Sequence, residues 1–180
     1  MKVILDPATQ QASLVPDAAA EQYDLAGKTV VNVPDNFRWT TNIVDWDTLA
    51  IVADIEGARA AKWEAVKALR ATVQQGGCQT PSGPAQTDLE SRGLINGAVT
   101  LAMLSLQSGQ PFALEFTLAD NSSLTLDASA MIALGQAVGL FVAAAHAHSV
   151  TLRALIDSAP TIAAVDAIDI SVGWPEGWQA

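Results

Sequence analysis

The sequence predicts an α+β fold, in which a small β-rich N-terminal segment precedes a mainly helical domain. Short apolar runs separated by turn residues dominate positions 1–50. Further along, apolar residues recur at intervals of three and four, the spacing of one helix face. The helical part should hold three longer helices, one short helix and one β-hairpin. The change of pattern near residue 50 predicts two domains, residues 1–50 and 51–180.

The N-terminal segment contains three candidate strands. Residues 2–5 and 12–15 are short apolar runs on either side of an Asp6-Pro7 turn, which favours a hairpin. Residues 29–33 form the third run, and Pro34 closes it. The segment should therefore form a small sheet.

The first predicted helix runs from about Asp47 to Gln75. Asp47 or Thr48 could cap its start, and Gly76-Gly77 would end it. Residues 76–87 contain three Gly and two Pro, so we expect a loop or an irregular hairpin there. The helix is predicted from apolar residues spaced mostly three or four apart, namely Leu49, Val52, Ile55, Trp63, Val66, Leu69 and Val73.

The second predicted helix begins after Thr87-Asp88 and stops at Gly109-Gln110-Pro111. Asp88 should cap it, while Ser91 and Arg92 face the preceding loop or hairpin. Its apolar positions are Leu94, Ile95, Val99, Leu101, Ala102 and Leu106. Residues 112–118 and 123–126 then read as two strands, joined by a turn of Asp, Asn and Ser that tolerates tight hairpin conformations.

A long third helix is predicted from Ala130 to about Ser158, with Asp127, Ser129 or both as its cap. Thr161 should cap a short fourth helix that ends near Ile168. Within the long helix, residues 131–145 are apolar but are interrupted by Gly and Gln, and they fall short of the roughly 20 residues of a membrane span. We interpret them as part of a buried helix in a soluble protein.

Composition restricts the classes of partner. The 180 residues are half hydrophobic, enough for one domain with or without an appendage. The formal net charge of -10 repels phosphate groups, so we expect neither nucleic acid nor an anionic membrane as a ligand. The N-terminal residues lack a signal-peptide hydrophobic region. The single Cys78 cannot form a disulfide within the chain, which favours synthesis in a reducing compartment.

Patterns that would indicate catalysis or metal binding are weak. His146 and His148 differ by two positions and would point to opposite sides of a helix, so they should not share a metal ion. The carboxylate pairs Asp45/Asp47 and Asp166/Asp169 have no acid, base or nucleophile at a recognisable spacing. The sequence therefore predicts no enzyme, no catalytic residues, no cofactor and no metal.

The tryptophans outside the first helix are the best candidates for contact residues. Trp39, Trp46, Trp174 and Trp178 lie in segments of weak periodicity. They either dock the two ends of the chain onto its own surface or anchor a partner chain, because Trp is enriched among residues that dominate interface energies. Both interpretations stay open from sequence alone.

Four stretches between Lys62 and Pro175, about three fifths of the chain, resemble a phage domain of unknown function that recurs toward the C-termini of tail-fibre and tail-associated proteins. The resemblance implies a phage origin and a role in tail architecture or tail-fibre assembly, without catalytic residues. The four stretches are Lys67-Ala68-Leu69-Arg70, residues 87–98 with Thr87-Asp88-Leu89-Glu90-Ser91-Arg92, the hairpin at 119–126, and Ile168-Asp169-Ile170 with Gly173-Trp174-Pro175.

Taken with the composition, the resemblance leads us to expect a structural component of a bacteriophage tail, located in the virion tail and made in the host bacterial cytoplasm. Its partners would be other phage tail proteins, and the chain would form a homo-oligomer. Residues 1–50 would be the attachment element. The alternative is a tail-fibre assembly chaperone that the virion does not retain, and sequence does not separate the two.

Overall fold

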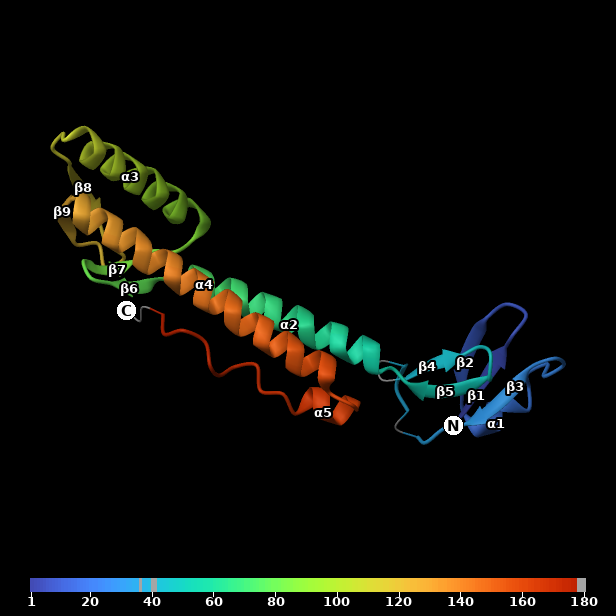
Figure 1. Ribbon diagram of the computed structural model, residues 1–180. Coiled ribbons are helices and arrows are strands. Elements are labelled where there is room, and N and C mark those ends of the chain that lie inside the picture. The colour runs from blue at the N-terminus through green and yellow to red at the C-terminus, as the bar shows by residue number, and fades with distance from the viewer. Residues whose placement is uncertain (36, 40–41, 178–180) are drawn as a thin grey trace. The chain divides into compact units, whose positions relative to one another are not determined.

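The computed structural model describes residues 1–35, 37–39 and 42–177 (Figure 1). The chain divides into two compact units. The first unit comprises Met1–Lys62 with Ala159–Ala167, and the second comprises Trp63–Ser158 with Ile168–Ala180. Small antiparallel sheets come first and long helices with a hairpin follow, so the α+β prediction is confirmed. Residue 50 lies at the start of a strand, and the units separate at Lys62 because the first long helix begins inside the first unit.

The first unit starts with a three-stranded antiparallel sheet in the order β2-β1-β3. Its strands are β1 (Lys2–Asp6), β2 (Gln11–Val15) and β3 (Thr29–Asn32), and the short helix α1 (Asp17–Ala20) follows β2. The central strand β1 is buried on both faces, because Val3 and Leu5 enter one cluster and Ile4 enters another with Ala20 of α1. The predicted N-terminal hairpin and third strand are confirmed.

A second hairpin corrects the predicted start of the first helix. β4 (Asn42–Asp45) and β5 (Ala50–Ala53) pair antiparallel where the helix was expected from Asp47. The side chain of Asp45 accepts the amides of Asp47 and Thr48, which builds a turn instead of a helix cap. Helix α2 (Ile55–Gln75) begins later, where Asp54 accepts the amide of Gly57 at 2.7 Å.

Residues 159–167 complete the first unit. Thr161 caps helix α5 (Ile162–Asp166) by accepting the amide of Ala164, as predicted. Arg59 donates from Nη2 to the carbonyl oxygen of Ala159, and Lys62 donates to that of Asp166. These bonds fix the segment to the start of α2.

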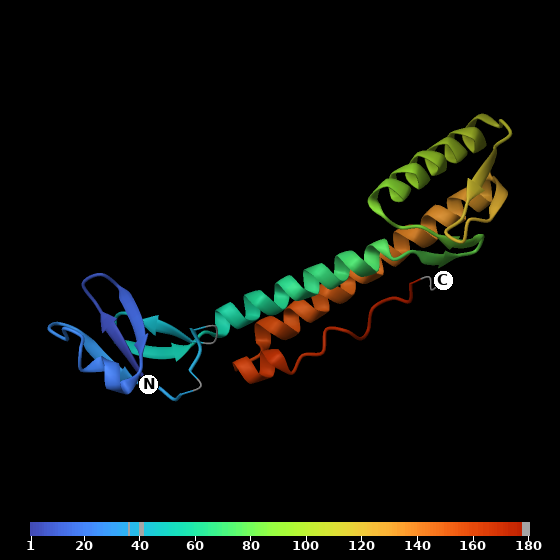
Figure 2. The ribbon, with the colours of Figure 1, turned by 180° about the vertical axis from the view of Figure 1, so that it is seen from behind.

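The second unit is built on helices α3 (Leu89–Ser108) and α4 (Ala128–Ser158), joined by the hairpin of β8 (Ala113–Thr117) and β9 (Ser123–Asp127). A smaller hairpin, β6 (Cys78–Thr80) and β7 (Gly83–Ala85), precedes α3. In Figures 1 and 2, α3 lies beside the first half of α4, and residues 63–75 of α2 lie beside its second half. The predicted caps of both helices are confirmed, since Asp88 accepts the amide of Ser91 and Asp127 that of Ala130.

One buried stripe runs the length of α4 and organises this unit. Its members recur every three or four residues, so they occupy one side of the helix. The first half of the stripe packs with α3 and both hairpins, and the second half packs with α2 and residues 168–174. The stripe consists of Ala128, Met131, Leu134, Val138, Phe141, Ala145, Ser149, Leu152 and Ile156.

Helix α3 packs closely on α4 through a glycine. A Cβ atom at Gly135 would lie 2.4 Å from Cγ2 of Val99, so no side chain fits between the two helices at that point. Ile95, Ala98 and Ala102 are the residues that α3 buries. Val99 is partly buried, and the other large apolar residues of α3 stay at the surface, including Leu101 at 61% exposed.

Helix α4 also meets the length and composition of a membrane-crossing helix, and it is the one helix in the described part of the chain that does. Its most apolar window has a mean hydropathy of 1.8. A third of that window (33%) is buried inside the protein. The core helix of a soluble protein passes the same test of length and composition, and α4 carries a buried stripe along one side that packs inside the second unit.

Candidate protein-contact sites

Two of the candidate tryptophans lie in the first unit, around Phe37. The Trp39 ring meets the Phe37 ring edge to face, with centroids 4.9 Å apart and planes at 84°. Phe37 is buried, whereas Trp39 is 37% exposed. Trp46 is half-buried and packs against the cluster that contains Phe37, Val3 and Leu5. Trp39 thus keeps an exposed face, while Trp46 contributes to the core of the unit.

Trp174 is docked on the second unit. Its Nε1 donates to the carbonyl oxygen of Ile170 at 2.8 Å, and its ring meets His148 edge to face at 4.7 Å. It packs with the cluster formed by Val66, Leu152 and Ile156. The structure therefore gives Trp174 intramolecular partners. Trp178, the fourth candidate, lies outside the described residues.

The two histidines have separate surroundings. His146 is exposed, whereas Nε2 of His148 lies 2.9 Å from the carbonyl oxygen of Val172 and donates to it. The adjacent Gly173 has φ of +86°, and a Cβ there would lie 2.6 Å from Cε1 of His148. Within residues 1–35, 37–39 and 42–177, no three His, Cys, Asp or Glu side chains are placed to hold one metal ion.

The remaining reactive candidates have structural roles. Cys78 is buried, and desolvation raises the pKa of its thiol. Hydrogen bonds from Thr48 and Asp47 lower the pKa of Asp45 in the β4–β5 turn. Asp169 accepts both the amide and the hydroxyl of Ser171. A deprotonated thiolate at Cys78 is thus disfavoured, and the two carboxylates serve to shape local turns.

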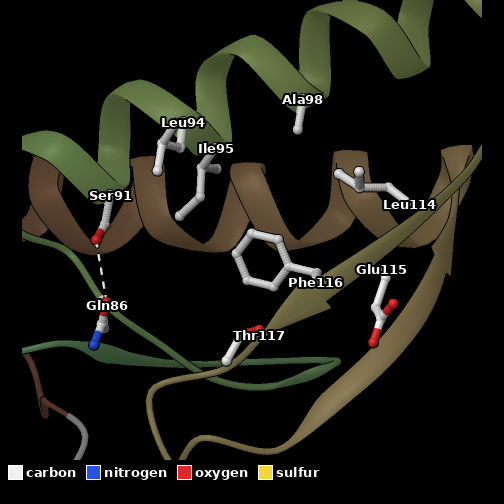
Figure 3. Close-up of a pocket in the computed structure, with 9 residues that line it drawn as sticks. All are labelled: Gln86, Ser91, Leu94, Ile95, Ala98, Leu114, Glu115, Phe116 and Thr117. Atoms are coloured by element: carbon white, nitrogen blue, oxygen red, sulfur yellow. Dashed lines mark hydrogen bonds between the residues drawn. The ribbon is translucent and has the colours of Figure 1, made fainter.

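A groove that the sequence did not reveal lies between α3 and β8 and has a volume of about 410 Å³ (Figure 3). From α3, Leu94, Ile95 and Ala98 point toward β8, and the Phe116 ring lies below them. At one end of the groove, Oγ of Ser91 lies 3.3 Å from Oε1 of Gln86. The residues of β8 that line the groove are the consecutive positions 114–117.

The involvement of consecutive residues shows that the groove follows the edge of β8. Alternate residues of a strand point to opposite faces, so a cavity on one face would touch only every second residue. Leu114 and Phe116 pack into the core, whereas Glu115 and Thr117 are exposed. The sequence held one signal for this groove, since α3 carries apolar residues around much more than one face.

A smaller pocket of about 220 Å³ lies on the other side of α3, against α4. It is lined by Arg92 and Asn96 of α3 and by Gly135, Val138 and Gly139 of α4, among others. The Nε atom of Arg92 is buried and has no hydrogen-bond partner among the residues that the structure describes. Arg92 therefore faces α4, and not the preceding loop or the hairpin as predicted from sequence.

Comparison with known proteins adds a family but no described relative. No curated protein and no solved structure matches the chain. Residues 57–172 match the family described as "Domain of unknown function (DUF4376)". The match begins near the start of α2 and includes the β6–β7 hairpin, α3, the β8–β9 hairpin and α4. It ends at residue 172, in the segment that docks at His148. Because it covers well over half of the chain, this protein belongs to the DUF4376 domain family.

Proposed function

We propose that this protein is a structural component of a bacteriophage tail, such as a tail-fibre, baseplate or tail-tip accessory protein, and that it acts through protein–protein contacts. The phage context rests on the resemblance of four stretches between Lys62 and Pro175 to a domain of tail-associated proteins. The contact role rests on the second unit, where a groove and a broad apolar surface are built on one helix.

The outer surface of α3 is the single observation that carries the contact role. Five of its large apolar side chains, at positions 94, 101, 103, 104 and 106, are 49–68% exposed. No Asp, Glu, Lys or Arg lies between Arg92 and Glu115 to solvate this surface. Extensive exposed apolar surface marks interaction sites in soluble proteins, and its concentration on one helix supports a contact role here.

A direct test is mass spectrometry of purified virions of the phage that encodes the chain. A stoichiometric peptide signal is expected for a structural component. The second candidate, an assembly chaperone for a tail fibre, is favoured by the open groove beside β8, which suits the transient capture of another chain. If the chain is present in infected cells but missing from particles, the structural role is wrong and the chaperone role is supported.

The role of the N-terminal β-rich region as the attachment element needs its own test. Removing residues 1–53 would delete both sheets of the first unit and leave the Asp54 cap of α2 in place. We expect this variant to be lost from virions, while Trp39→Ala in the full chain lowers incorporation. Normal incorporation of the shortened chain would contradict the assignment.

Homo-oligomerisation is part of the same proposal, because tail appendages match the symmetry of their mount. Light scattering of the purified protein should give a molar mass that is a multiple of 18.8 kDa. A mass of 18.8 kDa at every protein concentration would show that the chain is a monomer. Its partners would then be other proteins only.

A further inference from the structure

The outer edge of β8 has backbone groups that are available for pairing. The hairpin turn sets which groups these are, since Leu118 donates its amide to Ser122 at 2.8 Å. Hydrogen-bonded and non-hydrogen-bonded pairs alternate along an antiparallel ladder, so Phe116 and Leu114 also bond to β9. The amides and carbonyls of Ala113, Glu115 and Thr117 must then face the opposite edge. Within the described residues, β8 pairs with β9 alone.

A neighbouring strand bonds to the hairpin just beyond the end of β8. The amide of Ala119, in the hairpin turn, donates to the carbonyl oxygen of Pro84 in β7 at 2.9 Å. β7 ends at Ala85 and α3 begins at Leu89, and within the described residues no backbone hydrogen bond reaches the outer edge of positions 113–117. The edge is therefore oriented for pairing, and it is filled only at the tip of the hairpin.

The groove supplies a floor for the side chains of an added strand. Residues opposite one another in an antiparallel pair point to the same face. Side chains opposite Leu114 and Phe116 would enter the groove and contact Ile95 and Ala98, which are buried and apolar. The side chain opposite Glu115 would lie on the outer face beside its exposed carboxylate.

Charge selects among possible occupants. Glu115 is the one charged side chain that lines the groove in the described part of the chain. An acidic residue opposite it would be repelled, and a Lys or Arg would be attracted. The matching segment is thus extended, with a basic residue between two apolar ones.

Among the residues that the structure describes, the chain offers no free segment of this kind. Two segments outside the helices match the pattern, Met1-Lys2-Val3 and Phe37-Arg38-Trp39, but Val3 and Phe37 are buried in the first unit. A second copy would have to unfold that core in order to bind. A segment of a different protein would bind without any such unfolding. The net charge of -10 on this chain would also attract a basic segment.

We propose that the outer edge of β8 binds an extended segment of a partner protein by strand addition, with the pattern apolar–basic–apolar centred opposite Glu115. The inference rests on the proposed contact function and names the chemistry of the partner. Backbone hydrogen bonds hold the segment, and the groove under α3 together with Glu115 selects its sequence.

Selection of peptides from a random display library on the immobilised full chain tests the proposal. Enriched peptides should share the apolar–basic–apolar pattern, and the synthesised consensus peptide should slow hydrogen exchange at the amides of Glu115 and Thr117. Glu115→Pro removes an outward amide without removing a bond to β9, and proline is tolerated at such edge positions. It should weaken binding by about tenfold or more.

The matched control is Thr125→Pro. Thr125 stands opposite Glu115 in β9, and its amide faces the far edge of the hairpin, away from β8. Binding of the consensus peptide should stay unchanged in this variant. Glu115→Lys completes the set, because it should prefer a peptide in which the basic residue is replaced by Glu. Circular dichroism and thermal unfolding of each variant verify that the hairpin is folded.

Three outcomes would overturn the proposal. The first is that no peptide is enriched over the bare support. The second is that enriched peptides are acidic, or bind Glu115→Pro as well as the wild type. The third is an oligomer, detected by light scattering, that Glu115→Pro dissociates, which would show that a second copy occupies the edge. The assay uses purified protein, so its failure is distinguishable from absence of the chain from virions.

Discussion

Single residues at turns and caps decide how this chain begins and ends its elements. Asp88 is the clearest example, because its carboxylate accepts the Ser91 amide at 3.0 Å and the Ser91 hydroxyl at 2.6 Å. These bonds favour the charged form, so the pKa of Asp88 is lowered from its ordinary value of 3.8. A lowered pKa in the folded state makes stability depend on pH.

The direction of that dependence follows from linkage. The stabilisation by Asp88 is fully present above pH 3.8, its unfolded pKa, and is lost as the pH falls through its lower folded pKa. Asp88→Asn keeps a capping side chain but cannot ionise. The variant should therefore lose less stability than the wild type as the pH falls through this range. Urea unfolding measured between neutral pH and strongly acidic pH checks this.

Asp47→Asn is the control for this measurement. Asp47 is exposed, and its side chain accepts no hydrogen bond from the residues that the structure describes. The control should follow the wild-type curve. If the free energies of unfolding of Asp88→Asn and the wild type fall in parallel down to the lowest pH, the cap does not contribute to acid sensitivity.

At the scale of helices and strands, close packing of α3 on α4 depends on one missing side chain. The Cβ of Gly135→Ala would meet Val99 at 2.4 Å, and α3 would have to move away. We expect a loss of stability of about 1–3 kcal/mol from this overpacking. Thermal or urea unfolding measures it.

Gly139 gives a matched control one helical turn further along α4. Nothing lies within 4 Å of the Cβ position at Gly139, so alanine there meets open space. Gly139→Ala should stabilise the protein by about 0.5–1 kcal/mol, because alanine loses less backbone freedom in a helix. Equal effects of the two substitutions would show that the Val99 contact is relieved without cost.

Sequence patterns predicted most elements but not every boundary or face. The helix was expected from Asp47 because Leu49 and Val52 match a helical spacing, yet residues 50–53 also suit a β5 strand. Short apolar runs satisfy both periods, and pairing with β4 decides between them. The groove at β8 could not be predicted, since it depends on how α3 crosses a strand edge that is distant in sequence from Ser91.

At the scale of the whole molecule, the chain carries separate hydrophobic cores in its two units. Leu5 belongs to the core of the first unit and Leu134 to that of the second. Leu134→Ala should cost about 2–5 kcal/mol, as cavity-forming substitutions do. Hydrogen exchange should then accelerate in residues 63–158 and stay unchanged in residues 1–53.

Leu5→Ala is the reciprocal variant, and it should accelerate exchange in residues 1–53 alone. The pair tests whether each unit has its own stability, because each substitution is the control for the other. Acceleration across both units from either substitution would mean that the cores unfold as one.

The length and apolar composition of α4 lead to a prediction about membranes. Its buried stripe already packs against both clusters of the second unit, and insertion into a bilayer would expose those partners. We expect the purified chain to stay in the aqueous fraction when vesicles of neutral or anionic lipid are floated through a density gradient. Flotation of the chain with either vesicle, as for a single-span control protein, would contradict this.

The contact between Val99 and Gly135 also has a consequence for how relatives of this chain can vary. The two positions share one fixed volume, so neither can grow unless the other shrinks. An alignment of the family should show paired substitutions, with a larger residue at position 135 accompanied by a smaller one at position 99. A double variant carrying Gly135→Ala and Val99→Ala would make the same compensating pair of changes, because the smaller residue at 99 leaves room for the added methyl group at 135.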